Sequence, residues 1–219
     1  MPNRAAIVLC AALLGLTLRA GPAFPAPPAD RAAALAGLGA DEPARRAEAI
    51  AWIADHGAAG DAELLYPRLR DDSALVRSYA ESALWMLWSR SGDPALDELL
   101  ARGVEQMNNG RPQQAIATFS KLIRRRPSFT EAWNKRATAY FLTGKYRESI
   151  ADCQQVLKRN PRHFGALSGL GQIYLTLQDY EQALAWFRRA FEVDPNLEGV
   201  ELDIKALEEI LRQRRARTI

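Results

Sequence analysis

Few side chains in this sequence have the types and spacing that catalysis requires. After residue 26 the chain holds two histidines, His56 and His163, in separate segments, and a single cysteine, Cys153. It contains neither the His-Glu-x-x-His pattern of a zinc site nor the Gly-x-Ser-x-Gly turn of a serine hydrolase. Adjacent acids such as Glu208 and Glu209 are typical of an exposed helix face. We therefore predict a protein that is not an enzyme and that has no metal site and no cofactor.

Two glycine-containing stretches match phosphate-binding loops only in part. Gly144-Lys145 ends like a nucleotide-binding loop, but Ala139 stands where that loop needs its first glycine. Gly169 and Gly171 are followed by Tyr174 in place of a third glycine, and they lie in an expected helix rather than after a strand. Neither stretch indicates nucleotide binding.

The first 26 residues have the three-part form of an export signal. Arg4 supplies a positive charge, residues 5–18 are an almost uninterrupted apolar run, and residues 19–26 are rich in Gly, Pro and Ala. As a helix this run would reach only about 21 Å, against a hydrocarbon core of about 30 Å. We therefore expect signal cleavage, no stable membrane span afterwards, and a periplasmic or secreted protein. Cleavage would also remove Cys10, so no intramolecular disulfide is expected.

The rest of the chain is acidic at its front and basic at its back. Residues 27–94 contain 7 Arg and 11 acidic residues, whereas residues 95–219 contain 20 Lys plus Arg and 15 acidic residues. A field of this kind could guide acidic partners toward the C-terminal half. Many of the cations, however, stand at expected helix ends, where they complement the helix dipole. We therefore predict no nucleic-acid partner.

A period of 34 residues dominates the second half of the chain. Pro127, Pro161 and Pro195 are 34 residues apart, and the segments 96–129, 130–163 and 164–197 align without gaps. Bulky and small residues alternate at spacings of three and four, which predicts two amphipathic helices and a turn in each segment. The aligned sets are Leu99, Trp133 and Leu167; Gly103, Ala137 and Gly171; Gln106, Tyr140 and Tyr174; Ala115, Ser149 and Ala183; Phe119, Cys153 and Phe187; and Leu122, Val156 and Ala190.

These positions resemble the signature of the tetratricopeptide repeat (TPR) family, over residues 96–197. The departures are Arg102 and Arg136 where the family has Leu, Gln106 for Tyr, and Cys153 for Phe. The resemblance implies an all-α fold, a right-handed α-solenoid of three helix-turn-helix repeats. Such arrays need a solvated end, and we expect residues 198–219 to form a capping helix and basic tail.

The stretch before the repeats has a different spacing of apolar residues. Residues 42–95 resemble a single helical pair of the HEAT type, and residues 27–41 are expected to form a Pro/Ala-rich tether and a short helix. Trp85 and Trp88 share one helix face. We expect them to pack the front of the chain against the first helix of the repeats; the alternative is that they form a binding platform.

In the TPR family the first helix of each repeat lines a concave groove, at the second, fifth, ninth and twelfth positions. The corresponding residues are Asp97, Leu100, Val104, Met107, Glu131, Asn134, Thr138, Phe141, Gly165, Ser168, Gln172 and Leu175. From these and the adjoining loop, the predicted partner-binding set is Met107, Glu131, Asn134, Thr138, Phe141, Arg162, His163, Ser168 and Gln172.

One TPR subclass grips a C-terminal carboxylate with Lys, Asn and Arg side chains. The matching positions are Leu100, Val104, Lys135, Gly165 and Gly169, so that clamp is absent.

The stretches EAWNKRATAYFLTGKY and RNPRHFGALSGLGQIY are also similar to bacterial TPR proteins. We predict a non-enzymatic adaptor of the bacterial periplasm that binds a segment of a protein partner in the concave groove. The alternative is a structural or self-associating spacer of the cell envelope, which would use the tryptophans or the apolar stripe of the last helix.

Overall fold

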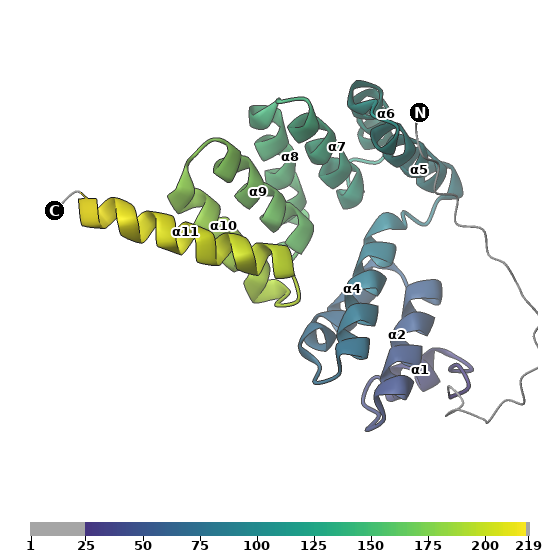
Figure 1. Ribbon diagram of the computed structural model, residues 1–219. Coiled ribbons are helices and arrows are strands. Elements are labelled where there is room, and N and C mark those ends of the chain that lie inside the picture. Colours follow the sequence, from purple (N-terminus) through teal and green to yellow (C-terminus); the bar gives the residue numbers. More distant parts are fainter. Residues whose placement is uncertain (1–24, 218–219) are drawn as a thin grey trace, which may run out of the picture.

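The computed structural model describes residues 25–217, and within that range every regular element is a helix. Residues 25–93, called the front below, hold four α-helices and two 3-10 helices, Ala59–Asp61 and Tyr66–Arg70. The α-helices are α1 (Arg31–Gly37), α2 (Pro43–His56), α3 (Ala62–Leu65) and α4 (Ala74–Ser89) (Figure 1). The prediction of an all-α fold is confirmed.

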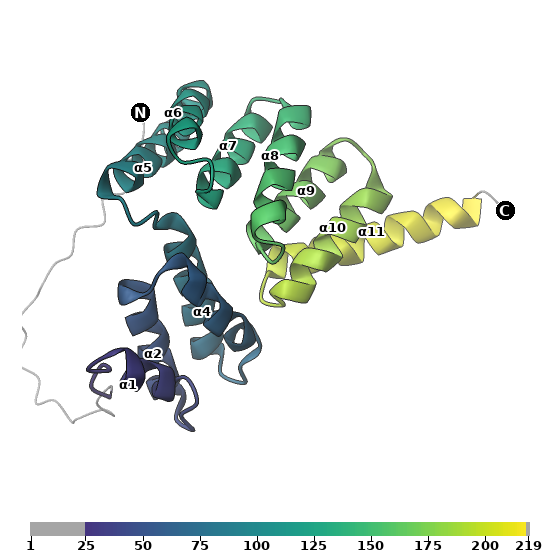
Figure 2. The ribbon, with the colours of Figure 1, turned by 180° about the vertical axis from the view of Figure 1, so that it is seen from behind.

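Residues 94–217, called the array below, form a series of helix pairs that follow an arc (Figures 1 and 2). The helices are α5 (Pro94–Asn108), α6 (Pro112–Arg125), α7 (Thr130–Leu142), α8 (Tyr146–Arg159), α9 (Phe164–Thr176), α10 (Tyr180–Val193) and α11 (Glu198–Arg217). The pairs α5–α6, α7–α8 and α9–α10 fall on the three 34-residue segments. This is the solenoid that the period predicts.

The turn inside each helix pair adopts the same backbone conformation three times. Gly110, Gly144 and Gln178, spaced by 34 residues, have φ of 69°, 73° and 62°. In each turn the next N–H bonds back to the first helix of the pair; Lys145, for example, donates to the carbonyl of Tyr140 at 2.9 Å. Glycine suits this helix-ending motif because a side chain is strained at positive φ. Gln178 bears that strain in the third pair.

Small residues allow the two helices of each pair to approach closely. A Cβ atom on Gly103 would collide with the ring of Phe119, and the third pair repeats this arrangement. In the middle pair Ala137 replaces the glycine and Cys153 replaces the phenylalanine, and both lie in one buried cluster. The smaller thiol leaves room for the alanine methyl group, so the pair stays close-packed. The departure at Cys153 is thus matched by its neighbour.

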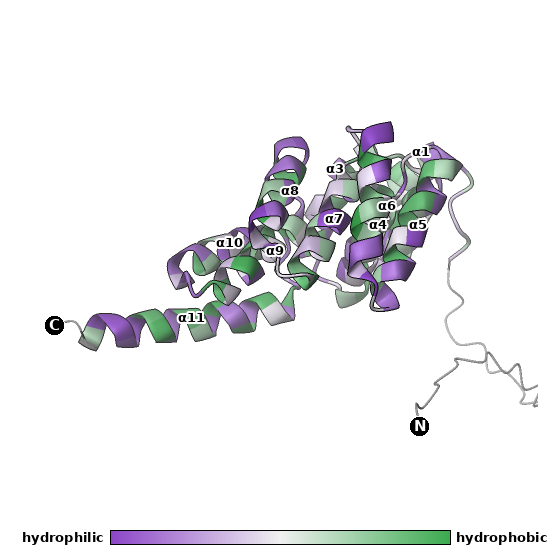
Figure 3. Cartoon of the chain, turned by 90° about the horizontal axis from the view of Figure 1, so that it is seen from above, coloured by the Kyte–Doolittle hydropathy of each residue, from purple (hydrophilic) through white to green (hydrophobic). Residues whose placement is uncertain are grey.

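The last helix, α11, packs against α10 and closes the array. Val200, Leu207 and Leu211 are buried, whereas Leu202 on another face is 66% exposed. Figure 3 shows apolar and polar turns alternating along α11. Among residues 25–217, none of the helices has the length and apolar composition to cross a bilayer.

The front has one core that α1, α2, α3 and α4 share. Its largest fully buried side chains are Ile50, Ile53, Leu65, Leu69, Leu84 and Leu87. Pro43 begins α2, where a missing backbone N–H leaves no helical bond unmade. This core continues into the array, because Phe164 of α9 belongs to the same cluster. The resemblance of the front to the HEAT type stays a prediction.

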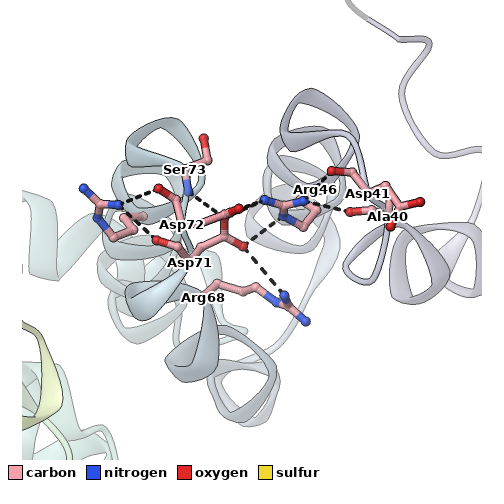
Figure 4. A network of polar contacts seen from close by, with 8 residues as sticks. Ala40, Asp41, Arg46, Arg68, Asp71, Asp72 and Ser73 are labelled. Carbon is pink, nitrogen blue, oxygen red and sulfur yellow. Dashed lines mark hydrogen bonds and ion pairs between the residues drawn. The ribbon is translucent and has the colours of Figure 1, made fainter.

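A buried ion pair ties the first turn of α2 to the turn before α4 (Figure 4). The guanidinium of Arg46 donates to both carboxylate oxygens of Asp71, at 2.7 and 2.9 Å. It also donates to the backbone carbonyls of Ala40 and Asp41, at 2.9 and 2.8 Å. Burial alone would raise the pKa of Asp71, but the hydrogen bonds from Arg46 and from the Ser73 N–H lower this pKa to about 2.

Candidate partner-binding surface

The front lies on the inner side of the arc, with α4 facing the array (Figure 1). Trp88 stacks on His163, with ring centroids 4.1 Å apart, and Trp85 meets the ring of Phe164 edge-on at 5.2 Å. A Cβ atom on Gly165 would collide with the Trp85 indole. The two tryptophans therefore contact the second and third helix pairs. The expectation that they pack against the first helix of the repeats is wrong.

These tryptophans cover a buried pair, the carboxylate of Glu131 and the imidazole of His163. His163 Nε2 is 3.0 Å from a carboxylate oxygen of Glu131, and both side chains are fully buried. Lys135 adds an ion pair to Glu131 at 3.1 Å, and its ammonium also lies 5.1 Å from the centre of the Trp85 ring. The junction between α4 and α7 is therefore both aromatic and charged.

The Glu131 carboxylate is held in its ionised form. Burial alone would raise the pKa of Glu131, but the hydrogen bond and charge of His163 oppose that effect. The Lys135 charge and a hydrogen bond from Asn134 add to this opposition, so the pKa lies below its ordinary value of 4.5. A buried carboxylate without such partners would be strongly unfavourable.

Three loops between helix pairs, which recur along the array with the repeats, add hydrogen bonds to the junction. The α6–α7 loop donates from Arg126 to the carbonyl of Ser91 at 2.7 Å. In the α8–α9 loop, Asn160 Oδ1 accepts a hydrogen bond from the Tyr66 hydroxyl at 3.1 Å. From the α10–α11 loop, Asn196 donates to the carbonyl of Leu69 at 2.8 Å. The front is thus fastened to three successive loops of the array.

Three of the predicted partner-binding side chains are used inside the protein. Glu131 and His163 are 0% exposed, and Asn134 is 6% exposed and donates to Glu131 at 3.1 Å. Glu131 and His163 are enclosed where α4 packs on the array. Asn134 also lines the cavity between α7 and α9.

Another part of the predicted set surrounds a small cavity between α7 and α9. Thr138 and Gln172 are exposed, and Phe141 is half-buried beside them. The cavity has a volume of about 130 Å³, and Cys153 is among its lining residues. Ser168 is half-buried one residue away from this lining, on α9. This is the part of the predicted groove that α4 leaves open, and we call it the open groove.

The remaining two predicted residues lie apart from the open groove. Met107 is half-buried near the end of α5, in the cluster of the first helix pair. Arg162 lies in the α8–α9 loop, where it pairs with Glu63 of the front and covers the Tyr66 ring at 3.8 Å. The nine predicted residues therefore do not form one continuous surface.

Sequence reasoning also missed residues that the structure brings together. Trp85 and Lys135 were not in the predicted set. Trp85 of α4 lies against Gly165 of α9, and the ammonium of Lys135 on α7 lies over the Trp85 ring. Arg90, Arg126 and Arg159 meet around a second, larger cavity. The one available signal was that Arg126 directly precedes a proline of the 34-residue period.

Comparison with known proteins assigns the array. The family model described as tetratricopeptide repeat matches residues 100–155 and 143–196. Residues 100–196 are tetratricopeptide repeats. A TPR repeat-containing protein of Rhizobium etli is 32% identical over 108 residues, covering 49% of this chain and 53% of the relative. The chain thus spans about half the length of that relative. A bacterial origin is consistent with this match.

Solved TPR domains share the fold. The first TPR of Spaghetti (RPAP3), solved with the HSP90 peptide SRMEEVD, superposes with a TM-score of 0.51 at 24% identity. The superposition covers 53% of this chain and 93% of that domain. The crystal structure of MamA gives a TM-score of 0.52 at 19% identity, covering 63% of this chain and 82% of MamA. These likenesses show the TPR architecture.

Proposed function

We propose that the protein is a non-enzymatic adaptor that binds a segment of a partner protein in the open groove. The observation that carries this proposal is the exposure of Thr138 and Gln172 on either side of the cavity between α7 and α9. Glu131 and His163 are buried where α4 packs, whereas Thr138 and Gln172 are the predicted partner-binding residues of α7 and α9 that are exposed. The TPR fold of solved peptide-binding domains supports the same use.

The chemistry of the open groove suits a short segment with an apolar side chain. The carboxamide of Gln172 offers a donor and an acceptor to an extended peptide backbone, and Thr138 adds a hydroxyl. Phe141 provides an apolar wall beside the cavity. Leu100, Val104, Gly165 and Gly169 replace the polar clamp of the carboxylate-binding subclass. The proposed partner segment is therefore recognised within its chain rather than by a C-terminal carboxylate.

We also propose that the adaptor acts in the periplasm of a bacterium. The support is the positive, apolar and small-residue order of residues 1–26, of which residues 1–24 lie outside the part of the chain that the structure describes. Mass spectrometry of the protein recovered from a periplasmic fraction tests this. A mass that lacks about 26 N-terminal residues is expected, and an uncleaved chain in the cytoplasmic fraction would contradict it.

The groove is tested with two exposed glutamines of neighbouring helices. Gln172→Arg places a bulky charge in the open groove, and Gln154→Arg places the same charge on α8, outside the cavity lining. Affinity purification from native envelope extracts, read by mass spectrometry, should recover a partner with wild type and with Gln154→Arg but not with Gln172→Arg. A partner retained equally by all three proteins would show that the open groove is not its site.

The alternative function as a self-associating spacer requires exposed tryptophans or an exposed apolar stripe on α11. Trp88 and the α11 residues Val200, Leu207 and Leu211 are buried within the chain. What favours self-association is the exposed apolar pair on α11, Leu202 at 66% and Ile210 at 37%. Light scattering over a concentration series decides this point. Dimers that disappear with Leu202→Glu would support the spacer function, and monomers throughout would remove it.

A further inference from the structure

A second cavity lies where the front meets the array, away from the open groove. Its volume is about 670 Å³, within the range of roughly 300–1,000 Å³ typical of ligand sites. From the front it is lined by the segment around α3 and by the end of α4 with the link that follows. From the array it is lined by the α6–α7 and α8–α9 loops. We call it the junction cleft.

Four arginines line the junction cleft, and Glu63 is the one acid among its lining residues. The arginines come from three chain segments: Arg90 from the end of α4, Arg126 from the α6–α7 loop, and Arg159 with Arg162 from the end of α8 and its loop. The front as a whole is acidic, yet here it contributes an arginine. The cleft therefore carries a concentrated positive charge.

Two of these guanidinium groups are held in place by neutral acceptors. Arg90 donates to the backbone carbonyls of Gly57 and Ala54, both at 2.6 Å. Arg159 donates to the carbonyl and side chain of Gln155, at 2.6 and 3.0 Å, and lies over the Trp133 ring at 5.0 Å. These bonds orient the two side chains without cancelling their charge.

The other two arginines have carboxylate neighbours that neutralise them weakly. Arg126 approaches Asp93 at 3.7 Å, beyond normal hydrogen-bond distance, while both side chains are about two-fifths exposed. Arg162 pairs with Glu63, whose side chain is 69% exposed. Exposed ion pairs of this kind contribute little and exchange readily with other carboxylates. A ligand with its own carboxylates could replace them.

The walls between the arginines are aromatic. Trp88 and Phe129 are largely buried and line the cleft together with Tyr66, which lies under Arg162. An occupant that matches this surface carries several negative charges and an apolar side chain. Guanidinium groups bind carboxylates with two parallel hydrogen bonds, which favours Arg over Lys at such sites.

We propose that the junction cleft binds an acidic, extended segment of a partner protein. A short peptide suits the cleft better than a single inorganic anion, because the volume is that of a drug-sized ligand and the charge is spread over three chain segments. The excess of basic residues in the array favours the approach of such a segment. This site is independent of the open groove, since the two cavities have no lining residue in common.

The test uses the chain without residues 1–26 and a fluorescein-labelled peptide of eight residues containing Asp, Glu and one Phe. A second peptide of the same length has Asn and Gln in place of the acids. Anisotropy should show saturable binding of the acidic peptide and at least tenfold weaker binding of the neutral one. Raising the salt to about 0.5 M should weaken the acidic complex, since exposed charges are then screened. Equal binding of both peptides, or no binding, would overturn the proposal.

Matched arginine variants locate the site. Arg159→Gln removes a cleft charge at the end of α8, and Arg147→Gln removes an exposed charge at the opposite end of the same helix. Arg159→Gln should weaken the acidic peptide about three- to tenfold and the double variant with Arg162→Gln further, while Arg147→Gln leaves it unchanged. Circular dichroism verifies that each variant is folded. Equal weakening by Arg147→Gln would show that general charge, not the cleft, is responsible.

Two further measurements separate this site from its alternatives. Gln172→Arg in the open groove should leave the acidic peptide bound, and loss of binding there would place the peptide in the groove instead. Competition with sodium sulfate distinguishes a peptide site from a small-anion site. If sulfate displaces the peptide only at concentrations at which sodium chloride displaces it equally, the result supports the peptide site. Displacement by micromolar sulfate would replace it with a site for small anions.

Discussion

The front and the array bury similar kinds of side chain but organise them differently. The front has one core, in which Ile53, Leu69 and Leu84 belong to a single cluster shared by all its helices. The array has three smaller clusters, each confined to neighbouring helices. Stability in a repeat array is a sum of local terms, whereas a single core is lost as a whole. The two bodies should therefore respond differently to damage.

The junction joins these two kinds of body through contacts far apart in sequence. The stacked pair Trp88 and His163 is separated by 75 positions, and the hydrogen-bonded pair Leu69 and Asn196 by 127. The 34-residue order of helix pairs continues beneath the front. What differs is the set of side chains that α4 covers, and this covering decides how much of the inner side a partner can reach.

The largest expected effect is a loss of local packing in the array. Phe119→Ala removes a fully buried ring and should lower the free energy of unfolding by about 3–5 kcal/mol. Because its cluster is local, hydrogen exchange should rise in α5, α6 and α7 and much less in α2. The matched variant Ile53→Ala should raise exchange throughout the front. Equal exchange across both bodies after Phe119→Ala would contradict the local organisation.

The buried acid of the junction should give a smaller, pH-dependent effect. The pKa of Glu131 is lowered on folding, so its contribution is complete above its ordinary value of 4.5 and is lost as the pH falls below that value. Glu131→Gln removes a charged hydrogen bond and should cost about 1.5–3 kcal/mol at neutral pH. The measurement is thermal unfolding of both proteins from about pH 7 to about pH 3.

Wild type should lose its advantage over Glu131→Gln as the solution becomes more acidic. The difference between the two curves isolates Glu131 from other carboxylates with lowered pKa values, such as Asp71. Parallel curves over the whole range would show that the Glu131 carboxylate contributes no pH-dependent stability.

Substitutions at two glycines of α9 distinguish packing at the junction from packing within the array. Gly165→Ala would drive a methyl group into Trp85 and should cost about 1–3 kcal/mol. Gly169→Ala meets only the Cys153 sulfur, at 3.9 Å, and should gain up to about 1 kcal/mol from its better helix propensity. Urea unfolding followed by tryptophan fluorescence compares the two. If both variants had the same stability, Trp85 would not lie against Gly165 in solution.

The smallest effect concerns the thiol in the array core. Burial, with the Asp152 charge beside it, raises the pKa of Cys153 to about 12, so little thiolate forms at neutral pH. In the chain without residues 1–26, iodoacetamide should label Cys153 only after urea is added. Gln154→Cys places an exposed thiol next to it and should be labelled at once. Rapid labelling of the native wild type would mean that the thiol is reached in the folded protein, through the open groove or by opening of the α7–α8 pair.

The sequence predicts the array well because its information is periodic. The 34-residue spacing locates α5 to α10, and the turns at Gly110 and Gly144 follow from the same alignment. Local patterns of this type report helix faces directly. They do not report which helix from elsewhere in the chain will cover a given face.

The candidate site was predicted less well for that reason. By repeat register Glu131 occupies a groove position and His163 lies in the adjoining loop, but the packing of α4 on the array buries both. Thr138 and Gln172, farther along the same helices, stay exposed. The repeat pattern does not indicate which of these residues are buried and which are exposed, because the front that covers them is a single, unrepeated unit.

The central claim is that α4 packs on the array at Trp88 and His163, and a double-mutant cycle tests it most directly. Free energies of unfolding are measured for wild type, Trp88→Leu, His163→Leu and the double variant. Side chains in contact give a coupling energy of about 0.5–3 kcal/mol, and the stacked rings at 4.1 Å predict a value in that range. Effects that add to within about 0.3 kcal/mol would contradict the packing of the front on the array.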